Sequence, residues 1–158
     1  MAAGSTYVKI ASTTLGSTAS SVTLSSIPGT YTDLVVTVTT STGGDINFRI
    51  NGDTSANYSQ TVIYGYSAFG STRTTNATSS YLNYGSNSGN FFATLNLLNY
   101  ANTTTYKTSL LRDSANGAIT DVMVGVWRST AAITSITFNP PSTFAVGSTF
   151  NIYGIAAA

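Results

Sequence analysis

SSIPGTYTDLVV, residues 25–36, places a proline and a glycine directly before a run of strand-forming residues. Proline fixes its own φ at about −65° and glycine tolerates a positive φ, so a type II turn is predicted at residues 27–30. The turn sets the register of the next strand, because a shift of one residue would move Leu34 and Val36 to the opposite face of a sheet. Tyr31 is expected to pack at this corner.

Strand signals recur on both sides of this segment. Short stretches of alternating apolar and polar residues, rich in β-branched and aromatic side chains, are separated by Gly, Asn and Pro. Helix signals are nearly absent, because the chain lacks Glu and its apolar residues do not recur at helical spacing. Strands are therefore predicted at residues 7–10, 21–24, 34–39, 46–50, 58–66, 81–84, 91–98, 104–111, 122–128, 133–138 and 150–155.

These strands indicate a single domain. A chain of 158 residues can bury one core without disulfides, and no repeat or linker divides it. About ten short strands with turns between them are typical of an antiparallel sandwich or barrel. We predict one all-β, jelly-roll-like β-sandwich over residues 1–158, with a short extended N-terminal arm at about residues 1–6. Residues 68–78, rich in Gly, Ser, Thr and Asn, are predicted to form a long surface loop.

The composition is unusually poor in charge. Charged side chains make up 7% of the residues, against roughly 25% in an ordinary soluble domain. The chain holds six Lys and Arg, five Asp and no Glu, which gives a net charge of +1. A free monomer normally uses charge to stay dispersed, so this composition suits a protein packed against neighbours in an assembly. An ordinary secreted β-domain is the alternative that the composition leaves open.

Two classes of partner are disfavoured by the sequence. The six cations are scattered, whereas a protein that binds a phosphate backbone carries a basic stripe, so no nucleic acid is expected. No apolar run approaches the roughly 18 residues of a membrane span, so no membrane partner is expected.

The sequence offers few groups for catalysis. His, Cys and Glu are absent, which excludes Ser-His-Asp and Cys-His sites. Two aspartate pairs could in principle serve a glycosidase, Asp45 with Asp53 and Asp113 with Asp121, but both are interpreted as turn residues. A Ca²⁺ site at residues 45–53 is disfavoured, because the spacing is not that of an EF-hand. We predict a protein that is not an enzyme and uses no cofactor or metal.

Aromatic and basic residues supply a candidate interface. Tyr64, Tyr66 and Phe69 could form a platform on which a sugar ring stacks, although packing within an alternating strand is the favoured interpretation. Trp127 is expected in the core, and Arg128 at a strand end is expected to contact a partner. The predicted interface consists of Arg128, Arg73, Tyr64, Tyr66 and Phe69.

Five segments run in order through most of the chain, and the pieces IPGTYTDL, NGDTSANYS and the terminal YGI are specific in combination. The five segments are SSIPGTYTDL (25–34), INGDTSANYS (50–59), NYANTTTYKT (99–108), GVWRSTAAITSI (125–136) and GSTFNIYGI (147–155). Together they resemble β-sandwich virion proteins of tailed bacteriophages, especially those of cyanophages and other aquatic phages.

The resemblance implies a function in the virion. It implies a capsid cement or decoration protein, which carries no catalytic motif and sits on the outer capsid surface where major capsid protein subunits meet. A homotrimer that stabilises the shell by burying surface is implied as well. The same module also occurs within tail or baseplate proteins of this family, so recognition of a host surface glycan is the alternative function.

Overall fold

The computed structural model describes residues 6–65, 68–85, 89–115 and 119–156 of the chain. Within these ranges the chain forms twelve strands, all paired antiparallel, and no helix, so no helix there could cross a membrane. The strands are β1 (Tyr7–Thr14), β2 (Val22–Leu24), β3 (Asp33–Thr40), β4 (Asn47–Ile50), β5 (Tyr58–Gly65), β6 (Phe69–Ala77), β7 (Ser80–Tyr81), β8 (Phe91–Leu98), β9 (Lys107–Ala115), β10 (Ile119–Trp127), β11 (Ile136–Asn139) and β12 (Thr149–Ile155).

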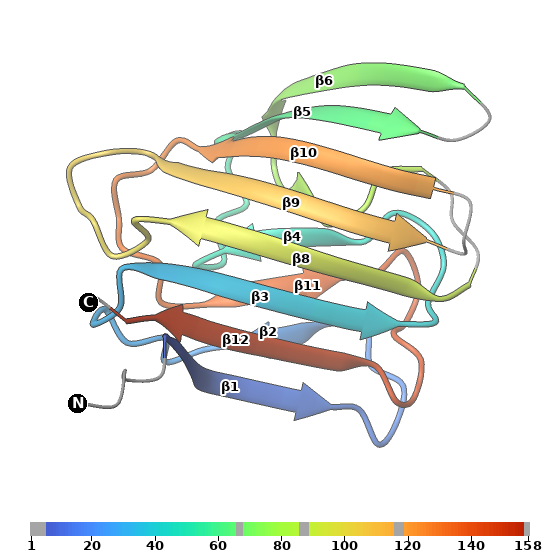
Figure 1. Ribbon diagram of the computed structural model, residues 1–158, viewed down its shortest axis with the longest axis horizontal. Helices are drawn as coiled ribbons and strands as arrows, with labels where there is room; N and C mark the ends of the chain where they lie inside the picture. Colours follow the sequence, from blue (N-terminus) through green and yellow to red (C-terminus); the bar gives the residue numbers. More distant parts are fainter. Residues whose placement is uncertain (1–5, 66–67, 86–88, 116–118, 157–158) are drawn as a thin grey trace.

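The strands form two sheets of unequal size. The large sheet has the order β1-β12-β3-β8-β9-β10-β5-β6, and the small sheet has the order β2-β11-β4-β7. Figure 1 looks onto the large sheet, with the small sheet behind it and the β5–β6 hairpin at the upper edge. The predicted all-β antiparallel sandwich is confirmed. Its jelly-roll topology is not confirmed, because the sheets hold eight and four strands whereas a jelly roll has eight in total.

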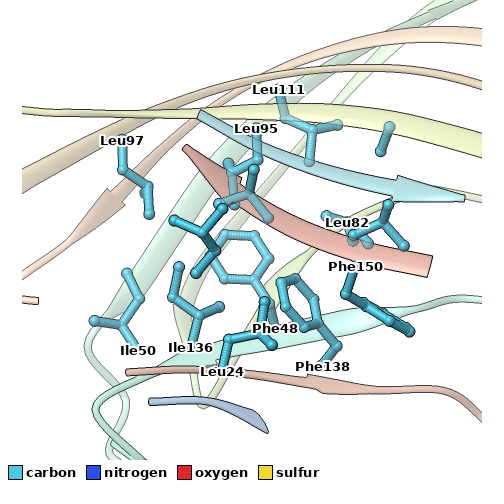
Figure 2. Packing of buried hydrophobic residues seen from close by; sticks show 14 of the residues in the cluster. Leu24, Phe48, Ile50, Leu82, Leu95, Leu97, Leu111, Ile136, Phe138 and Phe150 are labelled. Carbon is cyan, nitrogen blue, oxygen red and sulfur yellow. The ribbon is translucent and has the colours of Figure 1, made fainter. Parts of the chain in front are cut away.

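The core fills the space between the two sheets. Alternation along β3 and β8 turns every second residue toward the small sheet, and Leu34, Val36 and Leu95 are fully buried as a result. Each such side chain stabilises the fold by about 1.5–3 kcal/mol through burial. The core residues labelled in Figure 2 are Leu24, Phe48, Ile50, Leu82, Leu95, Leu97, Leu111, Ile136, Phe138 and Phe150.

The turn before β3 differs from the predicted type II turn. A type II turn needs a positive φ at Gly29, but Gly29 does not adopt one. The left-handed residue of this segment is Ser26, with a φ of 58°. The carbonyl of Pro28 accepts a hydrogen bond from the Tyr100 hydroxyl. A contact from a distant loop therefore supports this turn.

The corner at Tyr31 is packed, as the sequence predicts. The half-buried ring lies over the backbone of Gly154 in β12, where an added Cβ would come within 2.6 Å of the ring Cδ1. The next residue, Thr32, donates its N–H to the Ile155 carbonyl at 2.9 Å. The start of β3 is thereby tied to the last strand of the chain.

Strand β6 is the element that the sequence analysis missed. Residues 68–78 were predicted to form a loop, yet Phe69–Ala77 pairs with β5 along its length. No residue of β6 is buried, so the strand lacks the buried apolar alternation by which the others were found. Backbone hydrogen bonds to β5 hold it in place. The predicted loop is therefore wrong, and the hairpin extends the large sheet by one strand.

Candidate functional site and interaction surface

The face of the large sheet that turns away from the small sheet is uncovered within the described part of the chain (Figure 1). The alternation that fills the core also places apolar side chains on this outer side. We call this outer side of the large sheet the open face. Six apolar side chains on it are between 38% and 50% exposed: Ile63, Phe92, Leu98, Leu110, Val122 and Val124.

Strand register brings these side chains together. Val124 pairs with Leu110 across β10 and β9, and Val122 pairs with Ile63 across β10 and β5. Directly opposite residues have Cβ atoms about 5 Å apart, so these pairs form one continuous apolar patch. Threonine and asparagine, such as Asn96 beside Leu110, fill the positions around it. Contiguous exposed patches of this kind mark interaction sites more often than scattered apolar residues do.

The β5–β6 hairpin carries three of the predicted interface residues. Phe69 is 82% exposed, and Arg73 is exposed opposite Thr61 on the outer side. Tyr64 turns to the inner side, where its ring covers Gly70 and lies 5.7 Å from the ring centroid of Tyr84. Tyr64 and Phe69 thus lie on opposite sides of the hairpin and do not form one stacking platform. The third predicted aromatic residue, Tyr66, lies outside the described residues.

Arg128 is bound within the chain. Its guanidinium Nη2 donates to the carbonyl of Ala56 and to Oδ1 of Asn76, the latter at 2.8 Å. Arg128 therefore fastens the turn after β4 to strand β6. Its neighbour Trp127 is buried, as predicted, and its Nε1 donates to Oδ2 of Asp53 at 2.7 Å.

A polar cleft lies between the hairpin and the small sheet. Its volume is about 490 Å³, and its lining includes Asp45, Asn47, Thr74, Asn76 and Tyr81. Amides and hydroxyls can hydrogen-bond a polyhydroxylated ligand, and the tyrosine ring can stack on it. The sequence does not reveal this cleft, because its walls come from separate segments and one wall is strand β6, which was not predicted.

A pair of buried aspartates lies on the inner side of the large sheet. Asp113 of β9 and Asp121 of β10 are directly paired and expose only 8% and 2% of their surfaces. The Oδ1 of Asp113 accepts the Asp121 N–H at 3.1 Å, and the other three carboxylate oxygens are unpaired within the described residues. Their interpretation as turn residues is therefore wrong, because both lie within strands and face inward.

Burial changes the acidity of this pair. Loss of water, reinforced by the negative charge of Asp121, raises the pKa of Asp113 to about 8. Burial likewise raises the pKa of Asp121 to about 6. The nearby backbone of Tyr84 reduces this rise, although it forms no hydrogen bond of good geometry with the carboxylate. The pair therefore retains protons at a pH where exposed aspartates have lost theirs.

The other aspartate pair behaves differently. Asp53 is a turn residue, as predicted, and its Oδ1 accepts the Ser55 N–H at 2.8 Å. Asp45 lies in the loop before β4 and lines the cleft. Among the described residues, no three His, Cys, Asp or Glu side chains gather in a group that could hold a metal ion.

Comparison of the sequence with protein-family models and with curated proteins finds no match. The resemblance to phage virion proteins therefore stays a prediction.

Proposed function

We propose that this protein is a non-enzymatic structural protein of a phage virion, which binds the outer surface of the capsid and stabilises the shell of major capsid protein. The open face is the observation that supports this proposal. It places six exposed apolar side chains on the outer side of one uncovered sheet, four of them paired across strands, in a chain with very little charge to keep it dispersed. The five sequence segments that resemble phage virion proteins agree with this function.

The size of the open face suits a stable contact. Eight strands spaced about 4.8 Å apart, with an overlap of about 20 Å, give roughly 750 Å². A standard protein interface buries about 800 Å² on each partner. Since a sheet paired along its whole length is already ordered, little conformational entropy is lost when it binds. A cement protein would act in this way, by adding buried area across shell subunits.

The sheet edges suit contacts between copies. Strands β1 and β6 each pair on one side only within the described sheet. Backbone groups on their free sides can pair with another strand. Lateral contacts of this kind would support the homotrimer proposed for the assembled protein.

Electron microscopy of intact virions that contain this chain tests the proposal. We expect regular copies over the capsid, with the open face against the shell, and filled heads that become fragile without the protein. Copies confined to the tail would reject the capsid function.

A second candidate function is recognition of a host surface glycan. The cleft favours it, because its walls combine the amide of Asn47 with the ring of Tyr81 in a space of about 490 Å³, which can hold a sugar residue. In this case the protein would belong to the tail or baseplate.

Glycan binding by the purified protein tests this second candidate. On an array of bacterial polysaccharides, we expect Tyr81→Ala to weaken any binding roughly tenfold, since stacking on an aromatic ring contributes about 0.5–1.5 kcal/mol and the hydrogen bonds become misaligned. Phe92→Ala, which changes the open face, is the matched control and should bind as the original protein does. Absence of binding to every polysaccharide, or equal binding by Tyr81→Ala, would count against the cleft.

A further inference from the structure

The charges on the open face are almost all positive. Lys9 of β1 and Arg73 of β6 stand at opposite ends of one cross-strand row, roughly 34 Å apart over seven strand spacings. Arg112 of β9 lies in the adjacent row, paired with Val122. All three side chains are exposed. The row between Lys9 and Arg73 holds the uncharged residues Tyr153, Val35, Asn96, Leu110, Val124 and Thr61.

Acidic groups are almost missing from this face. Asp33, at the start of β3, lies at its rim, and the Oδ1 of Asp33 already accepts the Asn99 N–H at 2.6 Å. The other four aspartates are engaged elsewhere, in the buried pair, in the cleft and in the turn beside Trp127. Three of the six cations of this chain therefore lie on the open face, whereas four of its five aspartates lie away from it.

We propose that the open face binds an acidic, partly apolar protein surface, and that Lys9, Arg112 and Arg73 each meet a carboxylate of that surface. The inference rests on the proposed function, in which the partner is the capsid shell. Opposite charges at Lys9 and Arg73 on the two edge strands, and at Arg112 beside Val122, raise the rate of encounter and fix the register, while the apolar side chains supply the buried area. Binding should therefore weaken as salt rises, since exposed pairs are screened over about 8–10 Å.

A second copy of this chain fits the open face less well. Two open faces packed together would set three cations against three cations. Each copy could offer only Asp33, already partly engaged, in return. Like charges opposed in an interface are unfavourable, so charge complementarity favours an acidic partner over self-association.

Zero-length cross-linking tests the inference directly. A carbodiimide joins a lysine amine to a carboxylate without a spacer, and the chain has two lysines. Lys9 is exposed on the open face, whereas Lys107 is 2% exposed and its Nζ donates to the carbonyls of Thr105 and Thr130. In virions that contain the chain, we expect mass spectrometry to find Lys9 joined to an Asp or Glu of the shell protein, and Lys107 unmodified. Cross-links from Lys9 to another copy of the chain, or none from Lys9, would overturn the inference.

A charge reversal provides an independent measurement. Arg112→Glu should raise the concentration needed to occupy particles depleted of the chain roughly tenfold, because an attractive contact becomes repulsive. Arg49→Glu makes the same change in net charge on strand β4 of the small sheet and should leave occupancy unaltered. Equal effects of the two variants would refute the inference alone. Particles that never contain the chain would refute the proposed function as well, so the two failures can be told apart.

Discussion

Raising the pH from about 5 to about 9 should lower the melting temperature of this protein by at least about 5 °C, and Asp113→Asn should remove most of that loss. The reason is the buried pair, in which the pKa of Asp113 is raised to about 8 and that of Asp121 to about 6 from an ordinary 3.8. Circular dichroism melts at a series of pH values measure the effect.

The sign follows from where the protons are bound. Below about pH 4 both aspartates are protonated in the folded and the unfolded chain, so the pair does not change the free energy of unfolding. Above about pH 4 the unfolded chain has released these protons, while the folded chain retains that of Asp121 up to about pH 6 and that of Asp113 up to about pH 8, so rising pH favours unfolding. Above about pH 8 the loss is complete. In Asp113→Asn, the amide stays neutral at every pH and can donate to the carboxylate of Asp121.

Asp53→Asn is the matched control, because the pKa of Asp53 is lowered whereas the pKa values of Asp113 and Asp121 are raised. Partial desolvation raises the pKa of Asp53, but hydrogen bonds from Asn57, Trp127 and Ser55 outweigh it and hold the pKa at about 2. This carboxylate therefore stabilises the fold above about pH 4, and the stabilisation is lost as the pH falls toward 2. Asp53→Asn should lower the melting temperature at neutral pH and should not flatten the alkaline loss. An unchanged pH profile in Asp113→Asn would show that the aspartate pair is not buried as described.

The sequence predicts those strands whose two faces differ in environment. Residues 34–39 and 91–98 alternate or are continuously apolar because one side of each strand faces the core. The predicted bounds of both strands lie close to the observed bounds of β3 and β8. Strand β6 has no buried side, so its Ser, Thr and Gly residues resemble those of a loop, and only its backbone pairing with β5 defines it. Residue identity alone cannot reveal a strand of this kind.

The candidate sites depend on pairing that a single sequence does not show. The low charge of the chain indicates a packed surface, but which face stays open depends on the small sheet having only four strands. Asp113 and Asp121 are eight positions apart, and only the register of the β9–β10 hairpin sets them opposite each other on the inner side. Arg128 was expected at an interface, yet the carbonyl of Ala56 and the amide of Asn76 occupy its guanidinium. In each case a partner distant in sequence decides what the residue does.

Gly154→Ala should destabilise the protein by about 1–3 kcal/mol, although it adds a single methyl group. The new Cβ would lie 2.6 Å from the Cδ1 of Tyr31 and closer still to two other ring atoms, so the ring or strand β12 must move. Backbone strain is not the cause, because Gly154 does not adopt a positive φ. Urea unfolding followed by circular dichroism measures the loss.

A double-mutant cycle tests whether this destabilisation arises from the contact between Gly154 and the Tyr31 ring, which belongs to the segment 25–36. Tyr31→Ala alone should destabilise the protein by removing the packed ring, but Gly154→Ala should cost little once the ring is absent. The two changes should therefore be non-additive by about 1 kcal/mol or more. Gly16→Ala is the control, because no atom lies within 4 Å of an added Cβ there, and its effect should stay within about 0.5 kcal/mol. If the effects of Gly154→Ala and Tyr31→Ala simply add, the ring does not lie on β12, and the segment before β3 is held in register by its backbone hydrogen bonds alone.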